Sequence, residues 1–279
     1  MNQIENGVSV RRGRLNTLEF VDRKTVRKTS ILQETTRPHR LKIEAWAISE
    51  AKSRGVNAPT IVDFYQNNRG QEVLILERID GKTLSHCSLR ENASSMISVG
   101  EQMSLLENIS SNYGWIDPQT MTGKSKDWKI FLLSYAQTYG NRLVNEGIIS
   151  KKHLQHISSG IQDTDLSTSP YLVHRDIKLD NLIKDKDGKT WILDWENVIL
   201  GDPLYDLAIF GLTHKDILWE NLAITKRTTY DPQKYSIYEA VALIGLIDFC
   251  RKNKIDFIGR QRQFHDAVNR FAFSSKLHD

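Results

Sequence analysis

The sequence of 279 residues has few cysteines and no long hydrophobic run. Cys87 and Cys250 lie far apart without metal-ligand spacing, and two cysteines are too few for a disulfide-based fold. The longest apolar run, residues 240–247, is shorter than the roughly 20 residues of a membrane-spanning helix. Residues 1–5 contain no apolar signal core. These absences predict a protein of the reducing cytoplasm that has no membrane partner.

Neither sign of charge dominates: 38 Lys and Arg residues against 34 Asp and Glu residues give a formal net charge of +4. This excess is too small to indicate a nucleic-acid partner. Hydrophobic residues make up 39% and charged residues 26%, which is typical of a globular protein and argues against a disordered or fibrous one. The length allows one large domain or two small ones, with a core that needs no metal or disulfide.

The pattern of apolar residues divides the chain into two parts near Asp80-Gly81. Residues 1–79 are predicted to form a small strand-rich lobe that binds nucleotide, and residues 80–279 a larger, mostly helical lobe that holds the catalytic loop and the acceptor pocket. The first lobe should contain two strands and a turn at 15–29, a helix at 38–54, and strands at 60–65 and 72–79. In the second lobe, helices are predicted near 91–110, 126–146, 150–161 and 235–253. The expected fold class is α+β, and a crevice between two lobes commonly holds a ligand.

The residues that carry chemistry lie close together in the second lobe. A short apolar strand ends in His174-Arg175-Asp176, and Asn181 follows five residues after Asp176. The segments that flank Asp187-Gly188 are predicted to form a hairpin, which brings Asn181 near Asp194. Oxygen ligands of this kind suit Mg²⁺, and a loop carboxylate can accept the proton of an attacking hydroxyl. The arrangement suits phosphoryl transfer, with Asp176 as the base and Asn181 and Asp194 as the magnesium ligands.

The order of these residues resembles a known family. His174 to Asn181 match the pattern H-x-D-x-x-x-x-N, which is similar to the catalytic loop of the protein-kinase-like fold. Asp194-Trp195-Glu196 stands where Ser/Thr protein kinases have D-F-G, and the G-D-P-L-Y-D-L-A segment at 201–208 follows without room for an activation loop. Together these features resemble the aminoglycoside phosphotransferase and choline kinase family. The resemblance implies a bilobal protein-kinase-like fold that uses ATP, with GTP as the alternative, and Mg²⁺.

The same resemblance implies a nucleotide site in the first lobe. Lys28 stands at the place of the strand lysine that holds the nucleotide phosphates, and Glu44 at the place of the helix glutamate that holds this lysine. The strand before Asp80 resembles the hinge that binds adenine through backbone groups, here the Glu77 carbonyl and the Ile79 amide. One departure is the absence of a G-x-G-x-x-G loop, which disfavours a protein kinase.

Five further polar residues have expected roles. Lys178 is predicted to be catalytic, because it can reach the transferred phosphoryl group and neutralise its charge. His174 should brace the loop by hydrogen bonding, and Asp206 should hold the loop backbone. Asp202 is expected to cap a helix or brace a loop. Glu196 is predicted to bind metal through water or to face the substrate.

The expected acceptor is a small hydroxylated molecule, and the sequence leaves several classes of such molecules open. Pockets for aminoglycosides, which are polycations, are usually acidic, yet the segment after Asp206 has 11 Lys and Arg residues against eight acids. Glu220, Asp231 and Glu239 are the candidate pocket acids. The main hypothesis is an aminoglycoside or another antibiotic, and the alternatives are a choline, sugar or nucleoside kinase, a bacterial Ser/Thr protein kinase, or a nucleotide-binding scaffold without activity. A monomer and a dimer are both compatible with the sequence.

Overall fold

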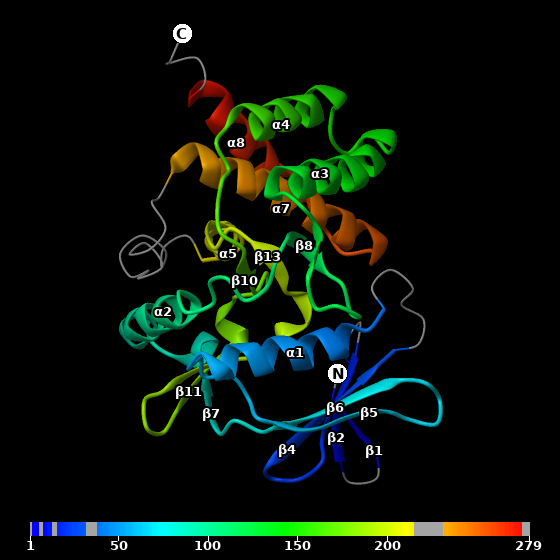
Figure 1. Cartoon of the computed structure of the whole chain (residues 1–279), viewed down its shortest axis with the longest axis vertical. Helices are drawn as coiled ribbons and strands as arrows, with labels where there is room; N and C mark the ends of the chain where they lie inside the picture. Colours follow the sequence, from blue (N-terminus) through cyan, green and yellow to red (C-terminus); the bar gives the residue numbers. More distant parts are fainter. Residues whose placement is uncertain (1, 6–7, 13–15, 32–37, 215–230, 275–279) are drawn as a thin grey trace.

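The computed structural model describes residues 2–5, 8–12, 16–31, 38–214 and 231–274. Figure 1 shows two parts, a strand-rich part that contains the N-terminus and a helical part that contains the C-terminus. The predicted α+β fold class with two lobes is therefore confirmed. No helix of the described residues has the length and apolar character needed to cross a bilayer.

A six-stranded antiparallel sheet forms most of the first part, with the strand order β1-β2-β3-β4-β6-β5. Its strands are β1 (Asn2–Glu5), β2 (Val8–Arg12), β3 (Asn16–Phe20), β4 (Thr25–Ser30), β5 (Ile61–Gln66) and β6 (Glu72–Glu77). The Asp22 carboxylate accepts hydrogen bonds from the amides of Lys24 and Thr25 at 2.6 and 2.7 Å and so closes the turn between β3 and β4. The predicted strands are confirmed, whereas the hairpin of β1 and β2 was not predicted.

Helix α1 (Arg40–Ser53) packs against this sheet, as the sequence predicts. Its buried face contains Leu41, Ala47, Ile48 and Ala51, which recur at helical spacing. The same face also carries Glu44, whose side chain is fully buried. A carboxylate buried on a helix needs a charged partner, and that partner lies on the sheet.

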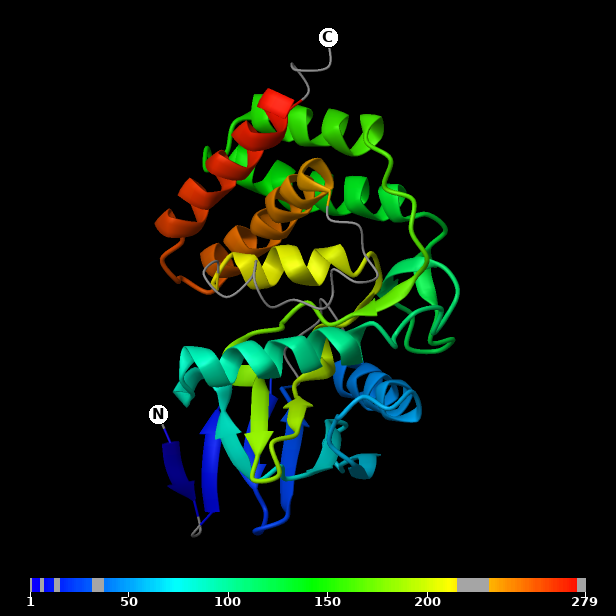
Figure 2. The same cartoon turned by 90° about the vertical axis from the view of Figure 1, so that its left-hand side faces the viewer.

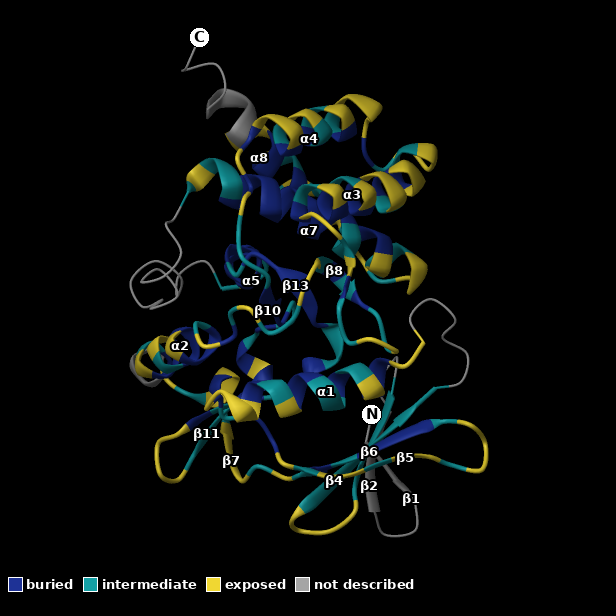
Figure 3. Ribbon diagram, viewed as in Figure 1, coloured by how far each residue is buried: buried dark blue, intermediate teal, exposed yellow. Residues whose placement is uncertain are grey.

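The second part consists of helices around a long buried core. The helices are α2 (Leu89–Met103), α3 (Trp128–Asn145), α4 (Lys151–Asp163), α5 (Leu204–Gly211), α7 (Pro232–Lys252) and α8 (Ile258–Ser274). Figure 2 shows α3, α4, α7 and α8 gathered at the end far from the sheet, and Figure 3 shows α7 as the most deeply buried helix among them. Ser150 caps α4 through a hydrogen bond from the His153 amide at 3.1 Å, as predicted.

Short strands position the residues of the predicted loop. Strand β10 (Tyr171–Val173) pairs with β13 (Ile199–Gly201). Strand β13 also pairs with β8 (Tyr113–Ile116), which in turn pairs with β9 (Gly123–Ser125). The predicted hairpin is formed by β11 (Leu182–Asp185) and β12 (Thr190–Ile192). Strand β8, strand β9 and helix α8 were not predicted from the sequence.

The hairpin of β11 and β12 takes up the chain just after it leaves the six-stranded sheet, because β11 pairs with β7 (Gly81–Thr83). A Cβ atom on Gly81 would lie 2.4 Å from the Lys184 carbonyl oxygen, so only glycine fits this strand pair. The six-stranded sheet ends at Glu77, and β7 already belongs to the hairpin of the second part. The division of the chain at residues 79 and 80 stays a prediction.

Candidate active site

The loop after β10 is held in place by a buried aspartate from α5. Asp206 accepts hydrogen bonds from the backbone amides of His174 and Arg175 at 2.7 and 2.6 Å, and Arg175 has a left-handed backbone with φ 63°. Burial raises the pKa of Asp206 to about 7, although the two amide bonds oppose this shift. Asp206 therefore holds the loop backbone, as the sequence predicts.

His174 braces the same loop from within. Its Nε2 lies 2.9 Å from the Leu193 carbonyl oxygen, and its Nδ1 lies 3.2 Å from the Asp176 amide. The amide can only donate, so Nδ1 accepts and Nε2 carries the proton that binds Leu193. Burial lowers the pKa of His174, with the charges of Asp176 and Asp194 opposing, so the ring is neutral. The predicted bracing role of His174 is confirmed.

Asp176, Lys178 and Asn181 form a compact group, the loop cluster. The Lys178 ammonium lies 3.1 and 2.9 Å from the two carboxylate oxygens of Asp176. The Asn181 amide nitrogen donates to the Asp176 carboxylate at 3.0 Å and to the Asp176 carbonyl at 2.9 Å. Because its nitrogen faces Asp176, Asn181 keeps its side-chain oxygen for another donor or for a cation. The Asp176 carboxylate is thus fixed by two neighbours of its own loop.

Lys28, Glu44 and Asp194 form a second group, the interlobe cluster. The Lys28 ammonium on β4 lies 2.7 Å from the Glu44 carboxylate on α1 and 2.6 Å from the Asp194 carboxylate after β12. Burial raises the pKa of Glu44 to about 7, and the charge of Lys28 opposes this shift. Burial acts to raise the pKa of Asp194, but the charge and the hydrogen bond of Lys28, together with weaker charges farther away, lower it overall. The single lysine therefore joins the two parts of the molecule through two carboxylates.

Glu196 has partners in the first part of the molecule, and its predicted role at a metal or a substrate stays a prediction. Its carboxylate binds the Arg40 guanidinium of α1 at 3.0 Å and the side-chain amide of Asn16. Arg40 also donates to the Asn197 side chain at 3.0 Å. Glu196 thus faces α1 and β3 of the first part. Arg40 was missed by the sequence reading because its partner lies 156 positions away, and the only local signal is its place one helical turn before Glu44.

The donor atoms around Asp194 fit a magnesium ion. Ligand oxygens of Glu44, Asp194 and Glu196 all lie within 4.8 Å of one another, and one Glu44 oxygen has no hydrogen-bond partner although it is buried. The Leu193 amide donates to the Asn181 carbonyl at 2.9 Å, which sets Asn181 beside the residue that precedes Asp194. Hard oxygen donors of this kind suit Mg²⁺. A buried carboxylate oxygen without a partner is an uncompensated acceptor that a cation would satisfy.

Glu77 and Ile79, the residues expected to bind adenine, lie at and just after the end of β6. The Glu77 amide donates to the Thr60 carbonyl at 2.8 Å, and the Glu77 carboxylate accepts from the Thr60 hydroxyl at 2.6 Å. Ile79 follows two residues later, before β7 begins at Gly81. The structure thus places both residues at the connection between the sheet and the hairpin, and their contact with a nucleotide base stays a prediction.

The described acids proposed for an acceptor pocket already have partners. Glu239 is 2% exposed and forms an ion pair with Arg270. Asp231 caps α7 by accepting hydrogen bonds from the amides of Gln233 and Lys234, and Glu220 lies outside the described residues. Asp202 accepts from the Leu204 amide at 2.8 Å, which confirms its bracing role. These contacts give no support to an acidic acceptor pocket.

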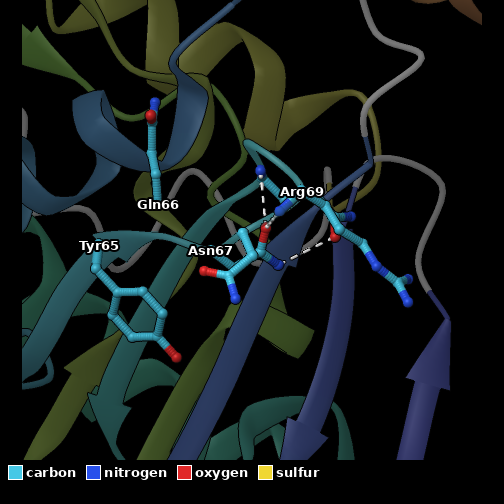
Figure 4. A pocket seen from close by; sticks show the side chains of 6 residues that line it. Tyr65, Gln66, Asn67 and Arg69 are labelled. Carbon is cyan, nitrogen blue, oxygen red and sulfur yellow. Dashed lines mark hydrogen bonds between the residues drawn. The ribbon is translucent and has the colours of Figure 1, made fainter.

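A hollow of about 450 Å³ lies at the turn between β5 and β6, at the opposite end of β6 from Glu77. Figure 4 shows its lining side chains, among them Tyr65, Asn67 and Arg69. The Asn67 side chain accepts hydrogen bonds from the amides of Arg69 and Gln71 at 2.9 and 3.1 Å, so it closes its own turn. No predicted site residue lines this hollow.

Comparison with solved structures identifies the fold. A thermostable mutant of aminoglycoside phosphotransferase APH(4)-Ia, in a ternary complex with AMP-PNP and hygromycin B, is similar with a TM-score of 0.76 and 17% identity over 95% of this chain and 94% of that chain. The GDP and kanamycin complex of APH(2")-IIIa is similar with a TM-score of 0.66 and 12% identity over 98% and 94%. A comparison with curated protein sequences found no match.

The molecule therefore has the bilobal protein-kinase-like fold that the resemblance implied. The model of the phosphotransferase enzyme family matches residues 3–243. Because this match covers most of the sequence, the chain belongs to the phosphotransferase enzyme family.

Proposed function

We propose that this protein is an ATP- and Mg²⁺-dependent phosphotransferase that moves the γ-phosphate to a hydroxyl group of a small molecule. The observation that carries the proposal is the presence of both the loop cluster and the interlobe cluster in one molecule. One cluster presents a fixed carboxylate on a loop, and the other presents a lysine between two carboxylates. These are the parts that phosphoryl transfer requires: a group that orients the hydroxyl, and charges that hold phosphates and metal.

Each residue of the two clusters has a role in this proposal. Asp176 orients the acceptor hydroxyl and takes its proton, while Lys178, bound to the same carboxylate, neutralises charge on the transferred phosphoryl group. Lys28, held by Glu44, binds the nucleotide phosphates. Asn181 and Asp194 would hold Mg²⁺, which supplies charge neutralisation at the phosphate oxygens when bound. The backbone carbonyl of Glu77 and the backbone amide of Ile79 would bind the nucleotide base.

For the acceptor class, we place antibiotics first. Solved structures of similar fold contain hygromycin B or kanamycin, together with AMP-PNP or GDP. The engaged state of Glu239 and Asp231 favours acceptors with less positive charge than an aminoglycoside. Choline, sugars and nucleosides are therefore the second class to test. ATP is the proposed donor, and GTP is the alternative.

A bacterial Ser/Thr protein kinase is a weaker candidate, favoured by the Arg175-Asp176 pair and by Lys178. Residues 195–203 connect Asp194 to α5 and already contain β13, so no activation segment fits between them. A protein substrate would therefore have to be recognised without such a segment.

The decisive experiment measures ADP release with Mg-ATP across aminoglycosides, other hydroxylated antibiotics, choline, sugars and nucleosides. Asp176→Asn serves as the control, and basic proteins with labelled ATP test the protein kinase alternative. Turnover with a small molecule that disappears in Asp176→Asn supports the proposal. Transfer of label to protein, without any small-molecule acceptor, would favour the kinase alternative. The absence of Mg-nucleotide binding would refute both.

A further inference from the structure

The Arg175 side chain, next to Asp176 on the loop, lies among aromatic rings. Its guanidinium carbon is 4.6 Å from the centroid of the Trp115 ring and 5.6 Å from that of Tyr135. One guanidinium nitrogen donates to the Tyr135 hydroxyl at 3.2 Å. A guanidinium stacked on aromatic faces is attracted to them electrostatically, most strongly when water is excluded.

These rings belong to a larger group from β8 and α3, the aromatic seat, which consists of Trp115, Trp128, Phe131 and Tyr135. The Trp115 ring meets the edge of Phe131 at a centroid distance of 6.0 Å and lies 6.1 Å from Tyr135. Trp128 stacks on Phe131 at 5.3 Å. Because the rings support one another, the two that contact Arg175 have little freedom to move.

Three glycines on three different elements leave room for the aromatic seat. A Cβ atom on Gly114 of β8 would lie 2.4 Å from Phe131, and one on Gly201 of β13 would lie 2.5 Å from Trp128. A Cβ atom on Gly245 of α7 would lie 1.8 Å from the Tyr135 hydroxyl. Each distance is far below van der Waals contact, so the close packing of the rings depends on the lack of side chains at all three positions.

Arg175 is therefore fixed at both ends. Its backbone amide is bound to Asp206, and its side chain is held by the aromatic seat. Arg175 itself has a left-handed backbone, and the next residue is Asp176. A shift of Arg175 would move the peptide that presents the Asp176 carboxylate.

We propose that Arg175 is a positioning residue, which acts through the aromatic seat to hold Asp176 ready for catalysis without phosphorylation of the protein. This proposal rests on the proposed function. Activation loops of protein kinases are ordered when an arginine pairs with a phosphorylated residue. In this chain the arginine is instead held by packed rings, which are present without modification.

Substitution of Arg175 gives the first test. Arg175→Met removes the charge and the hydrogen bond, and we expect kcat to fall about 10²-fold, the size of effect expected when a catalytic group is misplaced by roughly 1 Å. The KM for Mg-ATP should stay within about twofold of wild type, because Arg175 contacts no member of the interlobe cluster. Arg175→Lys keeps the cation and should recover part of kcat. Wild-type kcat in Arg175→Met would overturn the proposal.

A pair of glycine variants tests the aromatic seat without touching Arg175. Gly245→Ala displaces the Tyr135 hydroxyl that accepts from the guanidinium, while Gly140→Ala, on the same helix as Tyr135, produces a clash with Leu154 at 2.6 Å outside the seat. Both variants should lower Tm, but only Gly245→Ala should lower kcat, by about tenfold. An equal kcat in the two folded variants would contradict the proposal.

Two measurements separate this proposal from the proposed function. Amide hydrogen exchange of the peptide that spans residues 174–177 needs no acceptor, and it should be faster in Arg175→Met than in wild type. Unchanged exchange would overturn the role of Arg175 even if the protein is a phosphotransferase. Intact mass of the active protein should show no phosphate, and loss of activity after phosphatase treatment would also overturn the proposal.

Discussion

The two clusters of the candidate site are built in opposite ways. The loop cluster lies within six consecutive residues, from Asp176 to Asn181. The interlobe cluster joins positions 166 residues apart, because Lys28 of the sheet contacts Asp194 at the end of the hairpin. The first needs only a short loop of the right conformation. The second exists only when both parts of the molecule are folded and correctly placed.

The two lysines differ in burial, whereas the two aspartates do not. The Lys28 side chain is 13% exposed and is paired with the fully buried Glu44, whereas the Lys178 side chain is 41% exposed. The side chains of Asp176 and Asp194 are 27% and 31% exposed. The buried Lys28–Glu44 pair has no water to replace a lost partner, while the exposed Lys178 can be approached by an acceptor. Substitutions in the interlobe cluster should therefore change the KM for Mg-ATP and the magnesium dependence. Substitutions in the loop cluster should change kcat.

The largest effect is expected from Asp194→Ala. This change removes the proposed magnesium ligand and one of the two carboxylates around Lys28, so Mg²⁺-dependent ADP release should be lost. The matched control is Asp187→Ala, an exposed acid in the turn of the same hairpin, which should keep wild-type activity. Magnesium titrations of ADP release check this, and an unchanged magnesium dependence in Asp194→Ala would break the assignment.

Asp176→Asn should have the next largest effect. Turnover should fall by about 10²–10⁴-fold, the usual contribution of a general base. Nucleotide affinity should not change, because Asp176 contacts only members of its own loop through its carboxylate. Asp180→Asn, an exposed acid of the same loop, is the control. Initial rates and binding titrations with Mg-ATP measure both quantities, and near wild-type turnover would refute the role of Asp176.

Glu44→Gln should have a smaller effect, and on a different quantity. Loss of the charged hydrogen bond to Lys28 costs about 1.5–3 kcal/mol, so the KM for Mg-ATP should rise at least about tenfold. Glu50→Gln, on the same helix, should leave KM unchanged. The KM ratio of the two variants is the measurement. A fall in kcat with constant KM would mean that the two clusters are not functionally distinct.

The smallest effect concerns pH and Asp206. Because burial raises its pKa from 3.8 to about 7, the folded protein holds a proton on Asp206 that the unfolded chain releases. This contribution to stability is fully present below pH 3.8 and is lost as the pH rises to about 7. The Tm of wild type minus that of Asp206→Asn should therefore fall by a few degrees between pH 5 and pH 8. Thermal scans across this range check it, and a constant difference would contradict it.

Local patterns predicted much of the fold. The strands β3 to β6, helix α1, and the hairpin of β11 and β12 follow from apolar spacing and turn residues, and the structure contains them. Strands β8 and β9 and helix α8 were missed. Two of these are strands of three or four residues, too short for a periodic signal, and β8 owes its pairing to β13, about 85 residues later.

The sequence by itself determined the loop cluster, because the spacing of Asp176, Lys178 and Asn181 is fixed by covalent connection and by one short turn. It also indicated the roles of His174 and Asp206 as braces. Only the tertiary structure decided that Lys28 bridges Glu44 and Asp194, that Glu196 pairs with Arg40, and that aromatic rings hold Arg175. The physical reason is that these contacts join segments far apart in the chain, so their geometry depends on how the two parts pack, and no local pattern encodes it.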